Sequence, residues 1–420
     1  MVNELLMVSL LTFNTNYYVT KEQFVFVNRN NYEVYPNDSE FVDGNQQYLC
    51  DIDLPGAWFF TTGKKTNNIG FIDFYFDTSN ISDLTNRINN NLSNVYGSNQ
   101  YVTDFDHGVE TISIFGANTN LTGIAGVDWN SKIVTYDIED SYNFITCINN
   151  ANASNIKILS MSLNSTTNIP QIQYGIQNYN GLLISSAGNN SYNISYMYPC
   201  YPALYDYSNV ISVGGLDEND NLFSLSNYGT YVDIYAPATN ILTYNHSGQL
   251  VYDSGTSFAA PIVSGIASLI LSINPNISVS ELRNSLLNSA DLKYIQYPDN
   301  SYHYIKKINA ENAIKYSMTN YMNCNSLNVT YTDTISGSIF HGLHKYQLSG
   351  YASYKLTVRS QMYSAVDCIV FDSNFNELSL VNYSNNSYEK QYYLSNGTYY
   401  VLPKFAGSSS GYIDTKIIGV

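Results

Sequence analysis

Short apolar runs alternate with helix-compatible stretches between about residues 69 and 318, and this alternation constrains the fold more than any other feature of the chain. Each run has the length of a buried strand, and the runs are 69–74, 133–136, 156–161, 182–186, 210–213 and 232–235. Parallel strands need long crossover connections, which helices usually supply. The sequence therefore predicts an α/β fold, with a parallel sheet that is covered by helices on both faces.

The pattern changes towards the C-terminus. An apolar run of small residues at 256–273 predicts a long buried helix. Ser278 and Glu281 have the spacing of a capping box, which predicts that the next helix begins there, and a last helix is expected at about 310–317. After that, β-rich segments alternate with clusters of Gly, Asn and Ser. We therefore expect a small β-sandwich over residues 323–420.

The charge of the chain excludes one class of function. Its 420 residues include 34 Asp and Glu against 18 Lys and Arg, which gives a formal net charge of −16. Such a surface repels phosphate groups, so nucleic-acid binding is excluded. Charged residues make up only 12% of the chain while tyrosines number 41, a composition that is unusual for a cytosolic protein.

The N-terminal region and the glycosylation sequons favour export. No uninterrupted apolar run reaches the roughly 18 residues of a membrane-spanning helix, so no transmembrane segment is expected. The apolar run at 5–13 has the length of a signal-peptide core, and residues 1–33 are expected to be a signal or shortened propeptide segment. Residues 14–50 show no clear period and are expected to form an extended arm. Asn-x-Ser/Thr sequons, frequent by chance in an Asn-rich chain, favour an extracellular or cell-surface glycoprotein, and include Asn37, Asn80, Asn91, Asn120, Asn193, Asn276, Asn328, Asn382 and Asn396.

The five cysteines indicate neither a metal site nor a disulfide scaffold. None has Cys-x-x-Cys spacing, so a zinc site is not expected. Cys324 and Cys368 lie in the same C-terminal region and could form a bridge in an exported chain. Buried thiols are the expectation for the other three.

The most specific motif is a Gly-Thr-Ser turn that leads into the small-residue helix. Ser257 is then placed at a helix N-terminus, where free N–H groups and the helix dipole favour negative charge beside its Oγ. Small neighbouring residues allow a substrate backbone to approach. This placement suits a nucleophile, and the alternative is an ordinary residue in the first turn of a helix.

A serine nucleophile needs a general base, and His107 is the strongest candidate among five histidines. It precedes Gly108 and a helix-compatible stretch, whereas the others lie in polar or β-like contexts; these are His246, His303, His341 and His344. Asp73 ends a buried-looking strand, at the sheet edge where α/β sites form. Asn189 follows another strand, and its amide could donate to an oxyanion. The alternatives are a structural histidine, a turn-capping Asp and a turn Asn.

The order of these residues along the chain, Asp, His, Asn and Ser, resembles that of the subtilisin-like serine proteases, most closely their thermitase-like branch. Subtilisin has the same order of Asp, His and Ser. The resemblance covers about residues 34–318 and extends to further motifs: Tyr35-Pro36-Asn37-Asp38, Leu54-Pro55-Gly56-Ala57-Trp58, Thr122-Gly123-Ile124-Ala125-Gly126, Met161-Ser162-Leu163, Tyr201-Pro202-Ala203, Val210-Ile211-Ser212-Val213-Gly214 and Ala236-Pro237.

The resemblance implies a role for each of the four residues. Ser257 looks like the nucleophile, and His107 looks like the general base that later protonates the leaving amine. Asp73 is implied to orient His107, and Asn189 to donate to the oxyanion. No cofactor is implied for catalysis.

Further residues are implied to bind the substrate. Ser162, Leu163 and Asn164 resemble the edge strand that pairs with an extended substrate backbone, and the alternative is that this strand is only sheet core. Cys200 precedes the Tyr201-Pro202 motif and is expected to line a neutral primary pocket.

The chain departs from the family pattern near the implied site. The family's Asp-Thr/Ser-Gly is Asp73-Phe74-Tyr75 here, which lacks a hydroxyl that would help to hold the carboxylate and a glycine that would allow a tight turn. The family's usual His-Gly-Thr-His is His107-Gly108-Val109-Glu110 here. Asn164 stands where the family's substrate-binding strand normally ends in glycine. Every triad member is present, so activity is expected.

The resemblance also implies a structural calcium ion between the arm and the loop after the His107 helix. Ca²⁺ prefers about six to eight oxygen ligands. The candidates are Asp38, Asp83, Asn118, Asn120, Thr122 and Ile124, and the alternative is a solvated Asn-rich loop. Asn120 is also part of a sequon, and because a glycan on its amide would not fit beside a metal, Asn120 is expected to be unmodified.

The sequence therefore predicts a secreted, monomeric serine endopeptidase that hydrolyses polypeptides through an acyl-enzyme on Ser257. Through Gly397-Thr398-Tyr399-Tyr400-Val401, the C-terminal region more loosely resembles the prepeptidase C-terminal β-sandwich of secreted peptidases. The alternative function is a surface binding or adhesion protein with a catalytically impaired protease fold, which the altered turn after Asp73 favours.

Overall fold

The computed structural model describes residues 17–20, 25–28, 33–93, 105–138, 141–335, 342–406 and 411–420. Its contacts divide the chain into two compact units. The larger unit consists of residues 36–57 and 62–317, and the smaller unit of residues 1–35, 58–61 and 318–420. The apolar run at 5–13 and His341 lie outside the described residues.

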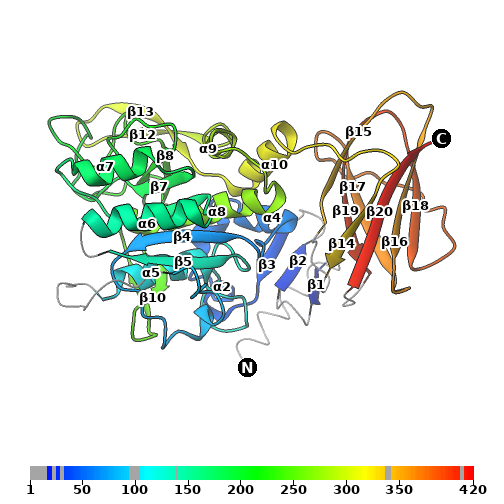
Figure 1. Cartoon of the computed structure of the whole chain (residues 1–420), viewed down its shortest axis with the longest axis horizontal. Coiled ribbons are helices and arrows are strands. Elements are labelled where there is room, and N and C mark those ends of the chain that lie inside the picture. The colour runs from blue at the N-terminus through cyan, green and yellow to red at the C-terminus, as the bar shows by residue number, and fades with distance from the viewer. Residues whose placement is uncertain are drawn as a thin grey trace. The chain divides into compact units, whose positions relative to one another are not determined.

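The larger unit is built on one eight-stranded sheet (Figure 1). Its strands along the chain are β4 (Asn68–Asp73), β5 (Lys132–Asp137), β6 (Ile158–Met161), β7 (Leu182–Ser186), β8 (Val210–Leu216), β9 (Ile234–Pro237), β12 (Asp291–Gln296) and β13 (Tyr302–Lys307). Their order across the sheet is β12-β13-β9-β8-β7-β6-β4-β5. The strands from β9 to β5 are parallel, and β12 and β13 form an antiparallel pair. Each of the six predicted apolar runs overlaps one parallel strand, so the α/β prediction is confirmed.

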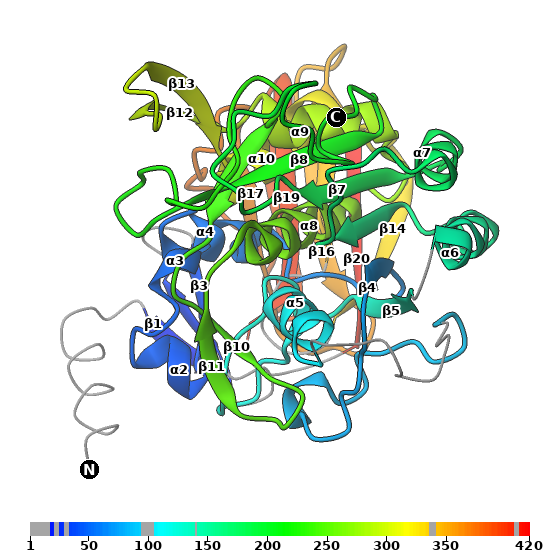
Figure 2. The ribbon, with the colours of Figure 1, turned by 90° about the vertical axis from the view of Figure 1, so that its left-hand side faces the viewer.

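Helices cover both faces of this sheet (Figure 2). They are α5 (His107–Gly116), α6 (Ser141–Ala153), α7 (Pro170–Gln177), α8 (Thr256–Ile273) and α9 (Val279–Leu287), and α10 (Ala310–Asn320) follows later in the chain. On one face, Phe144 and Ile148 of α6 and Ile176 of α7 join a buried cluster with the strands β4 to β7. On the other face, α8 packs against the strands β6 to β9 and against α5. The predicted capping box of Ser278 and Glu281 is formed at the start of α9.

One helix in the described part of the chain, α8, has the length and composition of a membrane span. The sequence analysis expected no such segment and took 5–13 as the longest approach to one. This helix is 89% buried inside the structure, as the central helix of a folded core would be.

The N-terminal region contains more regular structure than the expected extended arm. β1 (Tyr17–Thr20), β2 (Val25–Asn28) and β3 (Glu33–Pro36) form a three-stranded sheet, and α2 (Ser39–Val42), α3 (Gln47–Cys50) and α4 (Leu54–Phe60) follow. The residues of β3 alternate between half-buried and buried, but four residues are too few for this period to be recognised in the sequence. The larger unit also contains η1 (Ser82–Leu84) and a hairpin of β10 (Ile241–Tyr244) and β11 (Leu250–Asp253).

The C-terminal residues form two antiparallel sheets. Their strands are β14 (Thr330–Ile335), β15 (His344–Leu348), β16 (Tyr354–Ser360), β17 (Val366–Phe371), β18 (Glu389–Leu394), β19 (Gly397–Phe405) and β20 (Gly411–Gly419), in the orders β14-β20-β16-β18 and β15-β19-β17. Both sheets contribute to one buried cluster that includes Leu356, Val370 and Val401, so the predicted β-sandwich is formed. Cys324 is exposed, Cys368 is half-buried, and no disulfide joins them.

Candidate active site

Ser257 is the second residue of α8 and lies beside the end of β6. Its side chain is mostly buried, and its Oγ donates a hydrogen bond to the carbonyl oxygen of Ser162 at 3.3 Å. The Ser162 hydroxyl in turn donates to the carbonyl oxygen of Ser257 at 2.7 Å. Because the first N–H groups of a helix have no intrahelical partner, the start of α8 favours negative charge near Ser257 Oγ.

A His–Asp pair lies at the end of β4. His107 begins α5, and its Nδ1 lies 2.8 Å from Oδ1 of Asp73, the last residue of β4. The Asp73 side chain is 2% exposed and the His107 side chain 19%, so the imidazole extends from a buried carboxylate towards solvent. A carboxylate beside Nδ1 favours the tautomer with its proton there, which leaves Nε2 as the basic nitrogen.

His107 and Ser257 stand at the starts of two helices that pack together. The ring centroids of His107 and of Phe258, the neighbour of Ser257, are 6.2 Å apart. The hydrogen bond that the Ser257 hydroxyl donates is to the carbonyl oxygen of Ser162. Hydrogen bonds between a serine nucleophile and its base are often long in the absence of substrate and commonly tighten only when the substrate is bound.

Asn189 lies beside the first turn of α8. Its side-chain oxygen accepts hydrogen bonds from the N–H and the hydroxyl of Thr256, at 2.9 and 3.0 Å. A Cβ atom on Gly255 would lie 3.3 Å from Asn189 Nδ2, so a larger residue would crowd the amide. The NH₂ group therefore lies beside Gly255, two residues before Ser257.

The segment after β6 borders an apolar cavity of about 190 Å³. Its lining residues are all uncharged, and they are Phe74, Ile138, Met161, Leu163, Asn164, Ser165, Thr167, Ile169, Ile172, Tyr201 and Tyr205. The Asn164 amide donates to the hydroxyl of Ser186 at 2.7 Å, which ties this segment to the end of β7. The cavity suits an apolar side chain.

Cys200 is buried behind the turn that leads to Asn189. A Cβ atom on Gly188 would lie 2.7 Å from Cys200 Sγ, and Gly188 has a φ of 94°, so only glycine fits there. Burial raises the pKa of the Cys200 thiol to about 11, although a hydrogen bond with Asn227 opposes this. The thiol is therefore neutral at pH 7.

The calcium candidates centre on two buried carboxylates. Asp38 Oδ1 accepts the N–H of Asn120 at 2.7 Å, and Asp38 Oδ2 is buried without a hydrogen-bond partner among the described residues. Burial raises the pKa of Asp38 to about 7, and the nearby charge of Asp83 adds to this. Asp83 accepts hydrogen bonds from Tyr244 Oη and from Asn120 Nδ2. Two buried carboxylates with an unsatisfied oxygen fit a hard cation such as Ca²⁺.

The other calcium candidates lie in the loop beside these carboxylates. The N–H of Asn118 donates to the backbone oxygen of Asp83 at 2.7 Å, and its side chain donates to Thr85. The Asn120 side-chain oxygen accepts hydrogen bonds from Thr122. Burial raises the pKa of Asp83, and a backbone hydrogen bond from Ile124 opposes this rise. No third acidic, histidine or cysteine side chain completes a cluster within the described residues.

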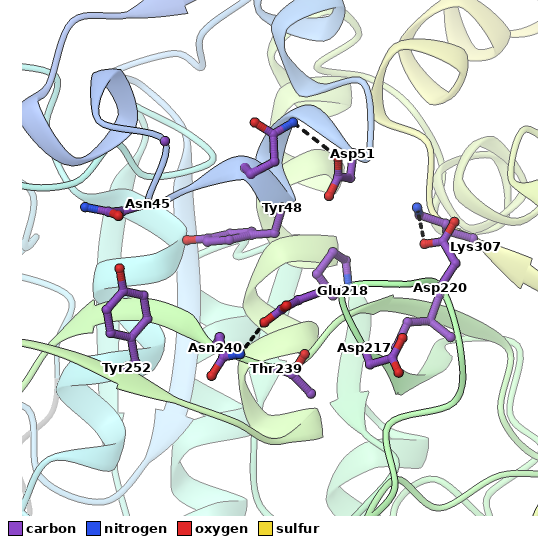
Figure 3. A pocket seen from close by; sticks show the side chains of 14 residues that line it. Asn45, Tyr48, Asp51, Asp217, Glu218, Asp220, Thr239, Asn240, Tyr252 and Lys307 are labelled. Carbon is purple, nitrogen blue, oxygen red and sulfur yellow. Dashed lines mark hydrogen bonds and ion pairs between the residues drawn. The ribbon is translucent and has the colours of Figure 1, made fainter.

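A larger cavity of about 350 Å³ lies beside α3 and the β10–β11 hairpin (Figure 3). Tyr48 and Tyr252 line it together with several carboxylates, and Lys307 is paired with Asp220. Its lining contains no serine, cysteine or histidine. This cavity therefore offers neither a serine nucleophile nor a histidine base, and the candidate active site is the one at Ser257.

Sequence reasoning missed a second His–Asp pair next to the first. His246, in the turn of the β10–β11 hairpin, has its Nδ1 2.6 Å from Oδ1 of Asp106, the residue before His107. A local pattern could not reveal this pair because its members are far apart in the sequence. The acidic residue directly before His107 was the only available signal.

Comparison with known proteins identifies the family. Residues 50–338 match the Subtilase family, Peptidase_S8. The chain belongs to the subtilase family. It is therefore a subtilisin-like serine endopeptidase, in agreement with the resemblance seen in the sequence.

Individual relatives and structures agree with this assignment. The subtilase is 30% identical to a thermophilic serine proteinase of Bacillus sp. (strain AK1), over 67% of its own length and 69% of the relative. It is 32% identical to thermitase of Thermoactinomyces vulgaris, over 61% of its own length and 91% of thermitase. The structure of the prenylagaramide maturation protease PagA shares the fold, with a TM-score of 0.51 and 23% identity over 63% of this chain and 98% of that protein.

Proposed function

We propose that this subtilase cleaves polypeptides through an acyl-enzyme on Ser257, with His107 as general base and Asp73 as the partner of His107. The observation that carries the proposal is the 2.8 Å contact between His107 Nδ1 and Asp73 Oδ1, on a helix that packs against α8. A serine at a helix N-terminus beside a His–Asp pair is the arrangement that activates a hydroxyl for acyl transfer.

The geometry supports the following sequence of steps. Ser257 Oγ attacks the carbonyl carbon of the substrate while its proton passes to Nε2 of His107, and Asp73 stabilises the imidazolium that forms. The carbonyl electrons move to oxygen, which accepts hydrogen bonds from Asn189 Nδ2 and from the start of α8. The C–N bond then breaks, and the leaving amine takes the proton from His107. Water repeats these steps on the ester and releases the acid.

The proposed substrate is an extended peptide segment beside β6. Backbone groups of Ser162, Leu163 and Asn164 are proposed to pair with the substrate backbone, as in strand addition to a sheet edge. The cavity of about 190 Å³ beside Leu163 is proposed to take an apolar substrate side chain. Cys200, neutral and buried near Asn189, is proposed to form part of a neutral primary pocket.

We further propose that the subtilase is an extracellular or cell-surface monomer. Several sequons have exposed asparagines that a glycan could reach, among them Asn80, Asn276, Asn328, Asn382 and Asn396. Mass spectrometry of the protein from its native source tests this placement, because glycans at these positions require export. An unglycosylated protein recovered from the cytosol would contradict it.

A structural calcium ion is proposed between Asp38 and Asp83. It would offset the repulsion of two buried carboxylates and supply a partner for Asp38 Oδ2. Asn118, Asn120, Thr122 and Ile124 are the proposed source of further oxygen ligands. The ion has no part in the steps at Ser257.

Labelling with a fluorophosphonate probe tests the catalytic proposal. Only an activated serine reacts, so the wild type should be labelled and Ser257→Ala should not. Ser254→Ala, which removes an exposed hydroxyl from the same turn, is the matched control and should label normally. A folded wild type that is not labelled would instead support the alternative function as a catalytically impaired binding or adhesion protein.

A further inference from the structure

The turn after β4 holds only one oxygen of the Asp73 carboxylate. Oδ1 accepts the N–H of Phe74 at 2.8 Å and lies 2.8 Å from Nδ1 of His107. Oδ2 is buried, and no group among the described residues donates to it. The direction of this carboxylate therefore depends on the backbone of the turn.

Tyr75 gives this turn an unusual backbone conformation. Its φ of 52° lies in the left-handed region, which glycine adopts freely and bulky residues adopt rarely. Its N–H donates to Oδ1 of Asp137, at the end of the neighbouring strand β5, at 3.2 Å. A strained residue persists only where its surroundings hold it, so the contacts of the tyrosine ring matter.

The ring of Tyr75 contacts two aromatic side chains from other parts of the chain. Its centroid lies 5.0 Å from that of Phe105, with the rings nearly perpendicular at 88°, and 6.4 Å from that of His246. Perpendicular pairs at these distances are favourable. Phe105 lies two residues before His107, so Tyr75 contacts the segment that leads into α5.

His246 holds the same segment from the β10–β11 hairpin. Its backbone N–H and its Nδ1 both lie within hydrogen-bonding distance of Asp106 Oδ1, at 2.9 and 2.6 Å. The carbonyl oxygen of His246 accepts a hydrogen bond from Asn80 at 3.2 Å, which anchors the hairpin turn itself. Asp106 directly precedes His107.

The turn and the start of α5 are in direct contact. A Cβ atom on Gly108 would lie 2.3 Å from the carbonyl oxygen of Phe74 and 2.5 Å from that of Tyr75. A shift of the turn would therefore move the start of the helix, and with it His107.

Four side chains make up what we call the aromatic clasp: Tyr75, Phe105, Asp106 and His246. We infer that the aromatic clasp positions Asp73 against His107, an inference that rests on the proposed function. The clasp joins the segments that carry these two residues to a third segment, the β10–β11 hairpin. Tyr75 and His246 are positioning residues, since they act through the pair, and small misplacements of reacting groups lower rates strongly.

Two substitutions of Tyr75 distinguish a role of its ring in the clasp from a role of its backbone in the turn. Tyr75→Gly removes the ring and suits the left-handed backbone, so the variant should fold. The clasp predicts that its kcat falls about tenfold while its KM stays within about twofold. Tyr75→Phe keeps the ring and should retain kcat within about twofold. A Tyr75→Gly enzyme as active as the wild type would overturn the inference.

Two substitutions of His246 test the other half of the clasp. His246→Ala removes the side-chain bond to Asp106 and should lower kcat several-fold. His246→Asn places an amide N–H near the position of Nδ1 and should restore part of the loss. His303→Ala, an exposed histidine on β13, is the matched control and should leave kcat unchanged. Equal kcat values for His246→Ala and the wild type would contradict the clasp.

A readout that needs no activity distinguishes failure of the clasp from failure of the proposed function. The ring nitrogens of His107 can be observed by NMR in ¹⁵N-histidine-labelled Ser257→Ala protein and assigned with His107→Gln. Adding Tyr75→Gly should shift these signals because the bond to Asp73 loosens, even if the wild type proves inactive. His107 signals that do not shift would overturn the clasp. Shifted signals, together with a wild type that proves inactive, would overturn only the proposed function.

Discussion

The side-chain oxygen of Asn189 accepts hydrogen bonds from both the backbone N–H and the hydroxyl of Thr256, the residue before Ser257. Two bonds to one oxygen fix the plane of the amide, so its NH₂ group is oriented before a substrate binds. A donor that is already oriented needs no reorganisation as negative charge develops. Thr256 thus links the proposed oxyanion donor to the proposed nucleophile.

Asn189→Ala should lower kcat by roughly 10²- to 10³-fold with little change in KM, because its amide would stabilise the oxyanion more than the ground state. Asn189→Asp keeps an acceptor for Thr256 but loses the NH₂ donor, and it should be impaired as well. Asn190→Ala, at the exposed next position, is the matched control and should stay near wild-type kcat. Steady-state kinetics on a peptide substrate gives these values, and an effect confined to KM would remove Asn189 from the oxyanion site.

Excess Ca²⁺ should raise the melting temperature of the subtilase, and EDTA should lower it. An ion that binds only the folded state raises the free energy of unfolding by about 2.7 kcal/mol when its concentration is 100 times its Kd. Asp38→Asn should abolish this response, because it removes one of the two buried carboxylates, while Asp43→Asn alters an exposed acid nearby and should keep it. A wild-type melting temperature that is indifferent to EDTA would exclude the ion.

Asn120 should be unglycosylated even where other sequons are occupied. Its side chain bonds to Asp83 and Thr122, so a glycan would break both contacts. Glycopeptide mapping of the protein from its native source checks this. A glycan found on Asn120 would also exclude this residue as a calcium ligand.

Local sequence patterns predicted the sheet and its helices well, because each buried position of a strand or helix requires an apolar or small residue. The run at 182–186 is buried along its whole length, and the helix at 256–273 is buried over all but its last two residues. The arm was predicted wrongly, since strands of four residues such as β3 are too short to show a period.

The candidate site was predictable only where its residues lie at the ends of regular elements. Asp73 ends a strand and His107 begins a helix, and the structure brings them within 2.8 Å. The aromatic clasp could not be predicted, because the contact of Tyr75 with His246 depends on how a distant hairpin packs. Long-range contacts of this kind leave no signal at either position.

The capping box of α9 should give a pH-dependent contribution to stability. The backbone N–H and the hydroxyl of Ser278 lower the pKa of Glu281 below its usual value. A carboxyl group whose pKa is lower in the folded state stabilises the folded protein. This contribution is complete at pH values above the pKa of the unfolded state, near 4.3, and it is lost as the pH falls. Urea unfolding should therefore show Glu281→Gln to be less stable than the wild type at pH 7, and the difference should shrink as the pH falls below about 4.3.

The serine of this box gives a second measurement. Ser278→Ala should lower the free energy of unfolding by about 1 kcal/mol at pH 7, because the Glu281 N–H loses its acceptor. Ser280→Ala changes a neighbouring exposed serine and should have little effect. If both variants behave alike, the box contributes nothing measurable.

Asp128 should be one of the most sensitive positions for the stability of the larger unit. It is fully buried, and its oxygens accept hydrogen bonds from the N–H groups of Asn130 and Ser131 and from the hydroxyls of Ser131 and Ser268, at 2.6 to 2.9 Å. Arg87 is buried beside it and donates to the carbonyl oxygen of Asp128 at 2.7 Å. Burial lowers the pKa of Arg87 to about 10, while the charge of Asp128 opposes this shift.

Asp128→Ala should lower the free energy of unfolding by about 3 to 5 kcal/mol, because it leaves the Arg87 charge buried without its counter-charge and several donors without an acceptor. Arg87→Met in the Asp128→Ala background should recover part of this loss, since it removes the uncompensated charge. The exposed Asp43→Ala is the control and should change stability by no more than about 0.5 kcal/mol. Urea unfolding of the four proteins measures these differences, and a double variant less stable than Asp128→Ala would show that Arg87 stabilises mainly through its bonds to backbone carbonyls.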